Sequence, residues 1–184
     1  AAYISLAVSA EGCADHIRSK LLNSLLQCVY KGLSDESGVV RGAALFALGQ
    51  FSEHLQPDIS QYSSELLPIL FASLNTASAH MEKEPRVVTK TYYALEMFCE
   101  NLGKDILPYL PQLMQYLLTA LSTATTSHAK ELAVSAIGAT ANAAREEIVP
   151  FFNQIMELLK GFLVPTQDER SEERRVGKEC RSRW

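Results

Sequence analysis

The sequence has few of the residues from which metal sites and disulfide frameworks are built. Its 184 residues include only four cysteines and four histidines. The cysteines are Cys13, Cys28, Cys99 and Cys180, and the histidines are His16, His54, His80 and His128. No two cysteines form a C-x-x-C pair, and no histidine has ligand spacing to another histidine or to a cysteine. We therefore expect no metal, no cofactor, and reduced, mostly buried cysteines in a nuclear or cytosolic protein.

Motifs that hold phosphates or activate nucleophiles are also missing. The sequence contains no G-x-G-x-x-G, no G-x-x-x-x-G-K-[ST], no H-E-x-x-H and no G-x-S-x-G. Serines are plentiful, but a catalytic serine needs an adjacent base, and the pattern of the chain accounts for the serines without one. We expect that the protein is not an enzyme.

Long apolar runs are absent as well. A membrane-spanning helix needs about 18 to 20 consecutive apolar residues, and the stretch from Leu66 to Leu74 is interrupted by Pro68 and Ser73. The chain begins Ala1-Ala2-Tyr3, without an initiator methionine or a basic segment leading into an apolar one. This start does not resemble a signal peptide, and it suggests a chain cut from a longer one. No membrane partner is expected.

What the chain does contain is a repeat. Apolar positions of one segment recur 47 residues later: Val40, Ala44, Ala47, Leu48, Phe51, Leu55 and Ile59 match Val87, Thr91, Ala94, Leu95, Phe98, Leu102 and Ile106. A third copy follows 42 residues further on and includes Ala136, Ile137, Ile148, Phe151, Ile155 and Leu159. Repetition at this period indicates a helical solenoid, in which each helix pair buries its apolar face by stacking on its neighbours.

The spacing of apolar residues predicts the individual helices. They are expected over residues 1–9, 15–34, 37–55, 59–74, 85–102, 106–121, 127–144 and 148–163. Gly12 should end the first helix, and Asp58 and Asp105 should cap the helices that follow them. Pro68 should kink its helix. The polar stretch 76–85 is expected to be the longest connection, exposed and mobile.

Charge is distributed unevenly. Residues 1–169 carry 11 Lys or Arg and 18 Asp or Glu, whereas residues 170–184 carry 6 and 3. An acidic body disfavours direct nucleic-acid binding and favours basic protein partners. From Asp168 onward the sequence has almost no aliphatic residues and matches no repeat. We predict a disordered tail over 169–184, whose composition is also consistent with non-native sequence added by read-through or cloning.

The first complete helix pair resembles the HEAT-repeat signature. The resemblance is carried by Asp35-Glu36-Ser37-Gly38-Val39-Val40-Arg41, Ala43-Ala44, Ala47-Leu48-Gly49 and Phe51. In that family the aspartate lies between the two helices and the arginine lies early in the second, so the resemblance implies that Asp35 and Arg41 form a structural ladder along the stack. The later copies depart from the signature, with Val88 and Lys130 in place of the arginine. We expect residues 1–168 to form an all-α HEAT-repeat α-solenoid, a right-handed superhelix of about three and a half antiparallel helix pairs.

Several stretches also resemble the importin-β class of nuclear transport receptors, or karyopherins. They are Ala43 to Glu53, Tyr93 to Glu96, Glu100 to Gly103, Pro108 to Pro111 and Ala129 to Ala136, and the resemblance covers about residues 4–163. It implies a receptor that carries basic cargo such as histones and ribosomal proteins, contacts Phe-Gly nucleoporins, releases cargo to the GTPase Ran, and shuttles between cytoplasm and nucleus. Ran is held mainly by the amino-terminal repeats in this class, and this segment resembles a later stretch, so no Ran-binding residues are carried over. A static HEAT scaffold, such as a phosphatase regulatory subunit, is the alternative.

Candidate binding residues come from the second helix of each pair, which lines the concave side of HEAT arrays. They are the four glutamates that the apolar face does not use, Glu53, Glu96, Glu100 and Glu131. Our hypothesis is an acidic surface for Lys- and Arg-rich cargo segments, and the alternative is a solvated helix face. Aromatic residues of the first helices could instead bind Phe side chains, but their recurrence at one repeat position favours core packing; they are Tyr62, Phe71, Tyr109, Tyr116, Phe151 and Phe152.

Overall fold

The computed structural model describes the backbone of residues 1–163, together with all of their side chains except those of 77–80 and 163. Every regular element within these residues is helical, as the sequence predicted. The chain divides into two compact units, residues 1–148 and a second unit that begins at Val149. The predicted tail, 169–184, and the last residues of the predicted array, 164–168, lie outside the described residues.

The first unit is a succession of helix pairs. Its elements are α1 (Ala2–Gly12), α2 (Ala14–His16), the π-helical turn η1 (Ile17–Leu21), α3 (Leu22–Leu33), α4 (Gly38–His54), the 3₁₀ turn η2 (Asp58–Tyr62), α5 (Ser63–His80), α6 (Pro85–Leu102), the 3₁₀ turn η3 (Gly103–Tyr109), α7 (Leu110–Thr123), α8 (Ser127–Ala144) and the 3₁₀ turn η4 (Arg145–Ile148). The pairs are α3/α4, α5/α6 and α7/α8.

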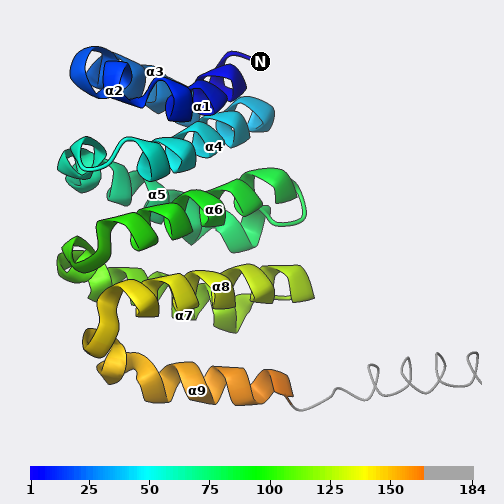
Figure 1. Ribbon diagram of the computed structural model, residues 1–184. Coiled ribbons are helices and arrows are strands. Elements are labelled where there is room, and N and C mark those ends of the chain that lie inside the picture. Colours follow the sequence, from blue (N-terminus) through cyan, green and yellow to red (C-terminus); the bar gives the residue numbers. More distant parts are fainter. Residues whose placement is uncertain (164–184) are drawn as a thin grey trace, which may run out of the picture. The chain divides into compact units, whose positions relative to one another are not determined.

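Helix α1 and the second helices of the three pairs form one layer. In it α1 packs on α4, α4 on α6, and α6 on α8, and all four run in the same direction (Figure 1). The first helices α3, α5 and α7 lie behind them and contact their own partners, and α5 also packs on α7. This arrangement confirms the predicted HEAT-repeat solenoid.

The core consists of the positions that recur in the sequence. Leu48 and Leu95 are fully buried in the middle of α4 and α6, and Phe51 and Phe98 are fully buried one turn later. Side chains three or four residues apart share one face of a helix, so each second helix presents the same apolar stripe to its neighbours. The repeat therefore specifies the seam between successive pairs.

Two predicted helix starts are wrong. The expected caps Asp58 and Asp105 lie in the 3₁₀ turns η2 and η3, and neither side chain makes a capping hydrogen bond. Each turn instead buries an isoleucine completely, Ile59 in η2 and Ile106 in η3. A 3₁₀ turn is tighter than an α-helical one, and the α-helices begin only after it, at Ser63 and Leu110.

The predicted long connection over 76–85 is also wrong. Helix α5 continues to His80, and only residues 81–84 join it to α6. The stretch contains alanines, which favour helix strongly, and Thr76 Oγ1 donates to the carbonyl of Ser73 at 3.1 Å within the helix. Met81, the first residue of the connection, is buried, so apolar contact anchors a segment that looked polar.

Another expectation fails near the amino terminus. Helix α1 ends at Gly12, but the capping residue is Cys13 with φ −116°, so no left-handed glycine ends the helix.

The expectation of mostly buried cysteines fails as well. Among the described cysteines Cys13 and Cys28 are exposed and only Cys99 is buried. Burial raises the pKa of the Cys99 thiol to about 11, which keeps it protonated and unreactive at neutral pH.

The turns η3 and η4 start with residues at positive φ, and these make a matched pair for a stability test. Gly103 has φ 52° and Arg145 has φ 55°, a region in which a side chain costs about 1 to 3 kcal/mol. We expect Arg145→Gly to raise the free energy of unfolding by about 1 kcal/mol and Gly103→Ala to lower it by a similar amount. A Cβ on Gly103 would meet no atom within 4 Å. The change in unfolding free energy, measured by urea denaturation, would therefore reflect backbone strain and no steric clash. Destabilisation by Arg145→Gly would contradict the expectation.

The second unit contains one described helix, α9 (Val149–Leu163). It covers nearly all of the predicted range 148–163. Ile155 is buried, whereas Val149 and Phe152 are exposed. The helix is therefore amphipathic, as the third copy of the repeat predicted.

Candidate partner-binding surface

The exposed side of α1, α4, α6 and α8, opposite the first helices, is the surface to which the candidate glutamates belong; we call it the second-helix face. Because the four helices run in the same direction, their first turns lie at one end of the face and their last turns at the other (Figure 1). The position of a residue along its helix therefore decides which end of the face it occupies.

The last turns carry an acidic cluster. Glu53 and Glu100 lie at equivalent repeat positions near the ends of α4 and α6, and both are exposed. The Oε2 atom of Glu53 accepts a hydrogen bond from Gln50 Nε2 at 3.1 Å and lies 3.9 Å from His54 Nε2. Both side chains are exposed, so a charged partner can reach them.

Glu96 lies one turn before Glu100 and is half-buried. Burial is the main cause that raises the pKa of its carboxyl, and the charge of Glu100 adds to it, whereas a hydrogen bond with Ser135 of α8 acts in the opposite direction. A buried carboxylate lacking a cation is costly. A basic side chain that approached Glu96 and Glu100 together would relieve this repulsion.

Glu131 is separated from the other three glutamates. It lies in the second turn of α8, eleven residues before Asn142, which is the repeat equivalent of Glu100. At about 1.5 Å per residue this places it roughly 16 Å further along the helix. Its Oε2 lies 3.8 Å from His128 Nδ1. The structure therefore gathers Glu53, Glu96 and Glu100 at one end of the face and leaves Glu131 towards the other.

Two features of the face were not foreseen from the sequence. Glu11 lies exposed in the last turn of α1, 42 residues before Glu53, and the repeat period is a signal that could have identified it. At the opposite end, the first turns of α6 and the connection before them carry Lys83, Arg86 and Lys90. The net acidic charge of the chain concealed this basic end.

The predicted Asp35–Arg41 pair is replaced by other contacts. The Asp35 carboxylate accepts from the backbone N–H of Ser37 at 2.8 Å, and Arg41 Nη1 donates to the backbone carbonyls of Asp35 and Glu36, each at 2.8 Å. The second arm of Arg41 forms an ion pair with Glu84 at the start of the next second helix. Arg41 thus links successive repeats, but through a glutamate 43 residues away rather than through Asp35.

Further polar contacts join the second helices to one another. Gln50 Nε2 donates to the hydroxyl of Tyr93 at 2.6 Å, and Ser52 Oγ donates to the carbonyl of Met97 at 3.1 Å. Between α6 and α8, Cys99 Sγ and Thr140 Oγ1 are 3.6 Å apart. These contacts fix neighbouring helices in register, so the spacing of charges on the face is also fixed.

The aromatic residues of the first helices are mostly inside. Phe71 is buried, and its ring lies 5.8 Å from that of Tyr116. Tyr62, Tyr109 and Tyr116 are half-buried, and in the second unit Phe152 is exposed. The contact between Phe71 and Tyr116 agrees with core packing, and a role in binding Phe side chains remains a hypothesis.

Within residues 1–163 no group of three or more His, Cys, Asp or Glu side chains is arranged to hold a metal ion. Of the helices in that range, none combines the length and the apolar character that crossing a membrane requires.

Comparison with known proteins identifies the family. The family model described as importin subunit beta-1-like, TPR repeats, matches residues 9–174; TPR and HEAT units are both helix pairs that stack into solenoids. Importin-4 of Mus musculus is 59% identical over 169 residues, and importin-4 of Homo sapiens is 56% identical over the same length, in each case 92% of this chain. The chain spans 15% of the length of these relatives.

The fold agrees with this relationship. The crystal structure of Kap121p matches with a TM-score of 0.78 and 31% identity, over 88% of this chain and 15% of that one. Crystal structures of Kap121p bound to Nup53p, to Pho4p and to RanGTP also match. The repeat, the stacked helix pairs and these similarities agree, and the chain belongs to the importin-β family of karyopherins.

Proposed function

We propose that this chain is a cargo-binding segment of a nuclear import receptor, and that the acidic end of its second-helix face binds Lys- and Arg-rich segments of protein cargo such as histones and ribosomal proteins. The observation that carries the proposal is the gathering of Glu53, Glu96 and Glu100 at one end of the packed and hydrogen-bonded helices α4 and α6. Charge-assisted hydrogen bonds from lysine or arginine would pair these carboxylates.

The wider function follows from the relatives. Kap121p has been crystallised with Nup53p, with Pho4p and with RanGTP. By analogy, the receptor to which this segment would belong contacts Phe-Gly nucleoporins, releases cargo when Ran binds elsewhere in the protein, and shuttles between cytoplasm and nucleus.

Charge reversal at the acidic end tests the proposal. The double variant Glu53→Lys and Glu100→Lys is expected to weaken binding of a labelled Lys/Arg-rich peptide about 10-fold or more at low salt, because two attractive contacts become repulsive. The difference should shrink as salt is raised and screening increases. Fluorescence anisotropy between about 50 and 300 mM salt would measure it.

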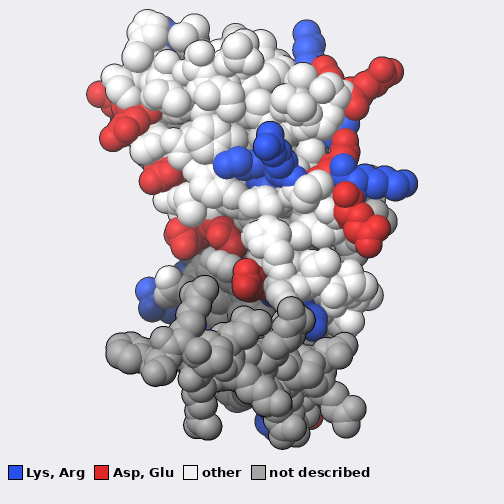
Figure 2. Space-filling view, turned by 90° about the vertical axis from the view of Figure 1, so that its right-hand side faces the viewer, with Lys and Arg blue, Asp and Glu red and all other residues white. Residues whose placement is uncertain are grey.

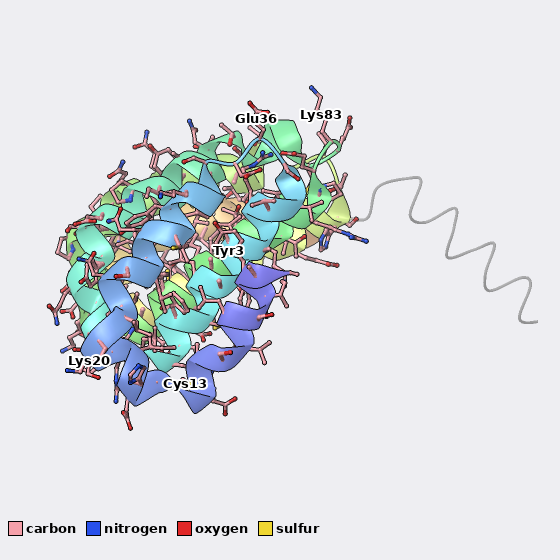
Figure 3. All side chains as sticks on the ribbon, turned by 90° about the horizontal axis from the view of Figure 1, so that it is seen from above. Tyr3, Cys13, Lys20, Glu36 and Lys83 are labelled. Atoms are coloured by element: carbon pink, nitrogen blue, oxygen red, sulfur yellow. The ribbon has the colours of Figure 1, made fainter. Side chains whose placement is uncertain are left out.

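The matched control is the double variant Glu36→Lys and Glu82→Lys. It makes the same change in net charge with two exposed residues near the opposite end of the helices, where Figure 3 labels Glu36. We expect its affinity for the basic peptide to stay within about 2-fold of the parent. Equal weakening by both doubles would mean that net charge alone attracts the peptide, and the proposal would then be abandoned.

A static HEAT scaffold is the second candidate function. Such a scaffold would bind partners through the connections between helices and would hold them whether or not Ran is present. Addition of RanGTP to a cargo complex of the longer receptor distinguishes the two, because only the transport receptor loses its cargo.

A further inference from the structure

A groove opens at the end of the second-helix face opposite the acidic cluster. It has a volume of about 850 Å³ and lies between the start of α1 and the first turns of α4 and α6. Its apolar lining comes mainly from Ile4, Val39, Phe46 and Val87, and its basic residues are Lys83, Arg86 and Lys90. Aliphatic side chains and cations therefore share one hollow.

Two glycines of α4 line the groove, Gly38 and Gly42. A Cβ on Gly38 would clash with Glu84 and lie 3.3 Å from Val87, so this glycine lets the start of α6 approach α4 closely. Val39 is 82% exposed, and Phe46 and Val87 are half-buried, so part of the apolar lining is accessible. Exposed aliphatic surface of this kind, set in a hollow, suits a partner that inserts an apolar side chain.

The exposed Glu36 and Glu82 lie at the same end of the helices, but three of the four charged residues that line the groove are cations. Its one acidic lining residue, Glu84, is already paired with Arg41. Lys90 Nζ lies 4.4 Å from the ring centroid of Phe46 and 5.1 Å from that of Tyr93, which holds its ammonium group over the aromatic floor. Among the ion pairs of the described residues, none involves Lys83 or Arg86.

The space-filling view shows cations and anions close together on this side of the molecule. Figure 2 looks at the side on which the α5–α6 connection lies, and blue side chains gather in the middle of the described surface with red ones beside them. A carboxylate that enters the groove would meet the cations that line it, Lys83, Arg86 and Lys90, whereas a basic segment would be repelled by them.

We propose that this groove binds an extended acidic peptide segment that carries a bulky apolar side chain. The apolar side chain packs against Val39, Phe46 and Val87, and the flanking carboxylates pair with Lys83, Arg86 and Lys90. The site is separate from the acidic end, since Lys90 and Glu100 are ten residues, or about 15 Å, apart along α6. One face would thus bind partner segments of opposite charge at its two ends.

A defined probe tests this proposal. A labelled peptide of sequence Asp-Asp-Leu-Phe-Asp-Asp should bind the chain, and versions with lysine in place of the aspartates, or serine in place of the leucine and phenylalanine, should bind about 10-fold more weakly or not at all. Anisotropy at about 50 mM salt is the measurement. If the lysine peptide competes for the groove equally well, the assigned charge preference is wrong.

Variants then locate the site. Lys83→Glu combined with Arg86→Glu should weaken the acidic peptide about 10-fold, while Lys20→Glu combined with Lys104→Glu makes the same charge change elsewhere and should leave it within about 2-fold. Figure 3 shows Lys20 and Lys83 at opposite ends of the helices. Val39→Ser removes apolar contact at an exposed position and should weaken binding several-fold without lowering the melting temperature.

The outcomes that overturn the proposal are distinct. If the groove double variant and the Lys20→Glu, Lys104→Glu control weaken binding equally, net charge alone attracts the acidic peptide. If Val39→Ser and the serine peptide both keep full affinity, no apolar contact contributes to binding. The groove variants should bind the Lys/Arg-rich peptide at least as well as the parent. This site and the acidic end can therefore fail independently.

Discussion

Replacing Leu95 by alanine is expected to lower the free energy of unfolding by about 2 to 5 kcal/mol. Leu95 is fully buried at the middle of α6, and α6 packs on α4, α5 and α8. The truncation leaves a cavity among three helices, and a central helix cannot relieve it by fraying as a terminal one could. Leu48→Ala, at the equivalent position of α4, should have an effect of the same size.

The control for Leu95→Ala is Val8→Ala, another aliphatic truncation in a helix. Val8 is 69% exposed, so its loss should change stability by less than about 0.5 kcal/mol. Urea denaturation followed by circular dichroism measures both variants. A loss below about 1 kcal/mol for Leu95→Ala would mean that the seam between repeats packs loosely there.

Adding one methyl group at Gly32 is expected to cost about 1 to 3 kcal/mol. A Cβ at this position would lie 2.6 Å from Tyr3 Cζ and 2.8 Å from the Cβ of Ala44. The tyrosine ring could turn aside, although its hydroxyl would then lose the 2.9 Å hydrogen bond to the carbonyl of Cys28. The Ala44 Cβ moves only with the backbone of α4, so α3 and α4 must separate.

The same substitution at Gly138 should have the opposite sign. A Cβ there would meet nothing within 4 Å, and alanine is favoured over glycine inside a helix by about 1 kcal/mol. The same glycine-to-alanine change is therefore expected to destabilise the protein at position 32 and to stabilise it at position 138. Thermal and urea unfolding of both would report the difference, and a gain in stability for Gly32→Ala would contradict the close approach of α3 and α4.

The fold could be predicted because the apolar residues that specify it recur in each repeat and at helical spacing. Leu48, Phe51, Leu95 and Phe98 recur at helical spacing, and each is fully buried. The 3₁₀ turns could not be predicted from local sequence, because they depend on tertiary contacts. In η2 the burial of Ile59 against the rest of the core accompanies the tighter 3₁₀ geometry. The continuation of α5 to His80 is also hidden in the sequence, because the polar residues of the stretch 76–80 suggest a loop although its alanines favour helix.

The candidate site was predicted only in part. Glu53 and Glu100 share a repeat position, so the period alone placed them on one edge. The separation of Glu131 depends on its place along α8, which composition does not give. The partner of Arg41 is Glu84, and a pair so distant in sequence leaves no local pattern to find. The groove forms only where α1, α4 and α6 meet in the fold, so no stretch of the sequence indicates it by itself.

The common direction of α1, α4, α6 and α8 has a consequence for how a partner would lie. Each helix has a partial positive charge at its amino end and a partial negative charge at its carboxyl end, and side by side these dipoles add rather than cancel. The side chains reinforce them, with Arg86 and Lys90 at one end and Glu53 and Glu100 at the other. A bound chain whose own charges are separated along its length would align with the helix axes, and in one orientation only.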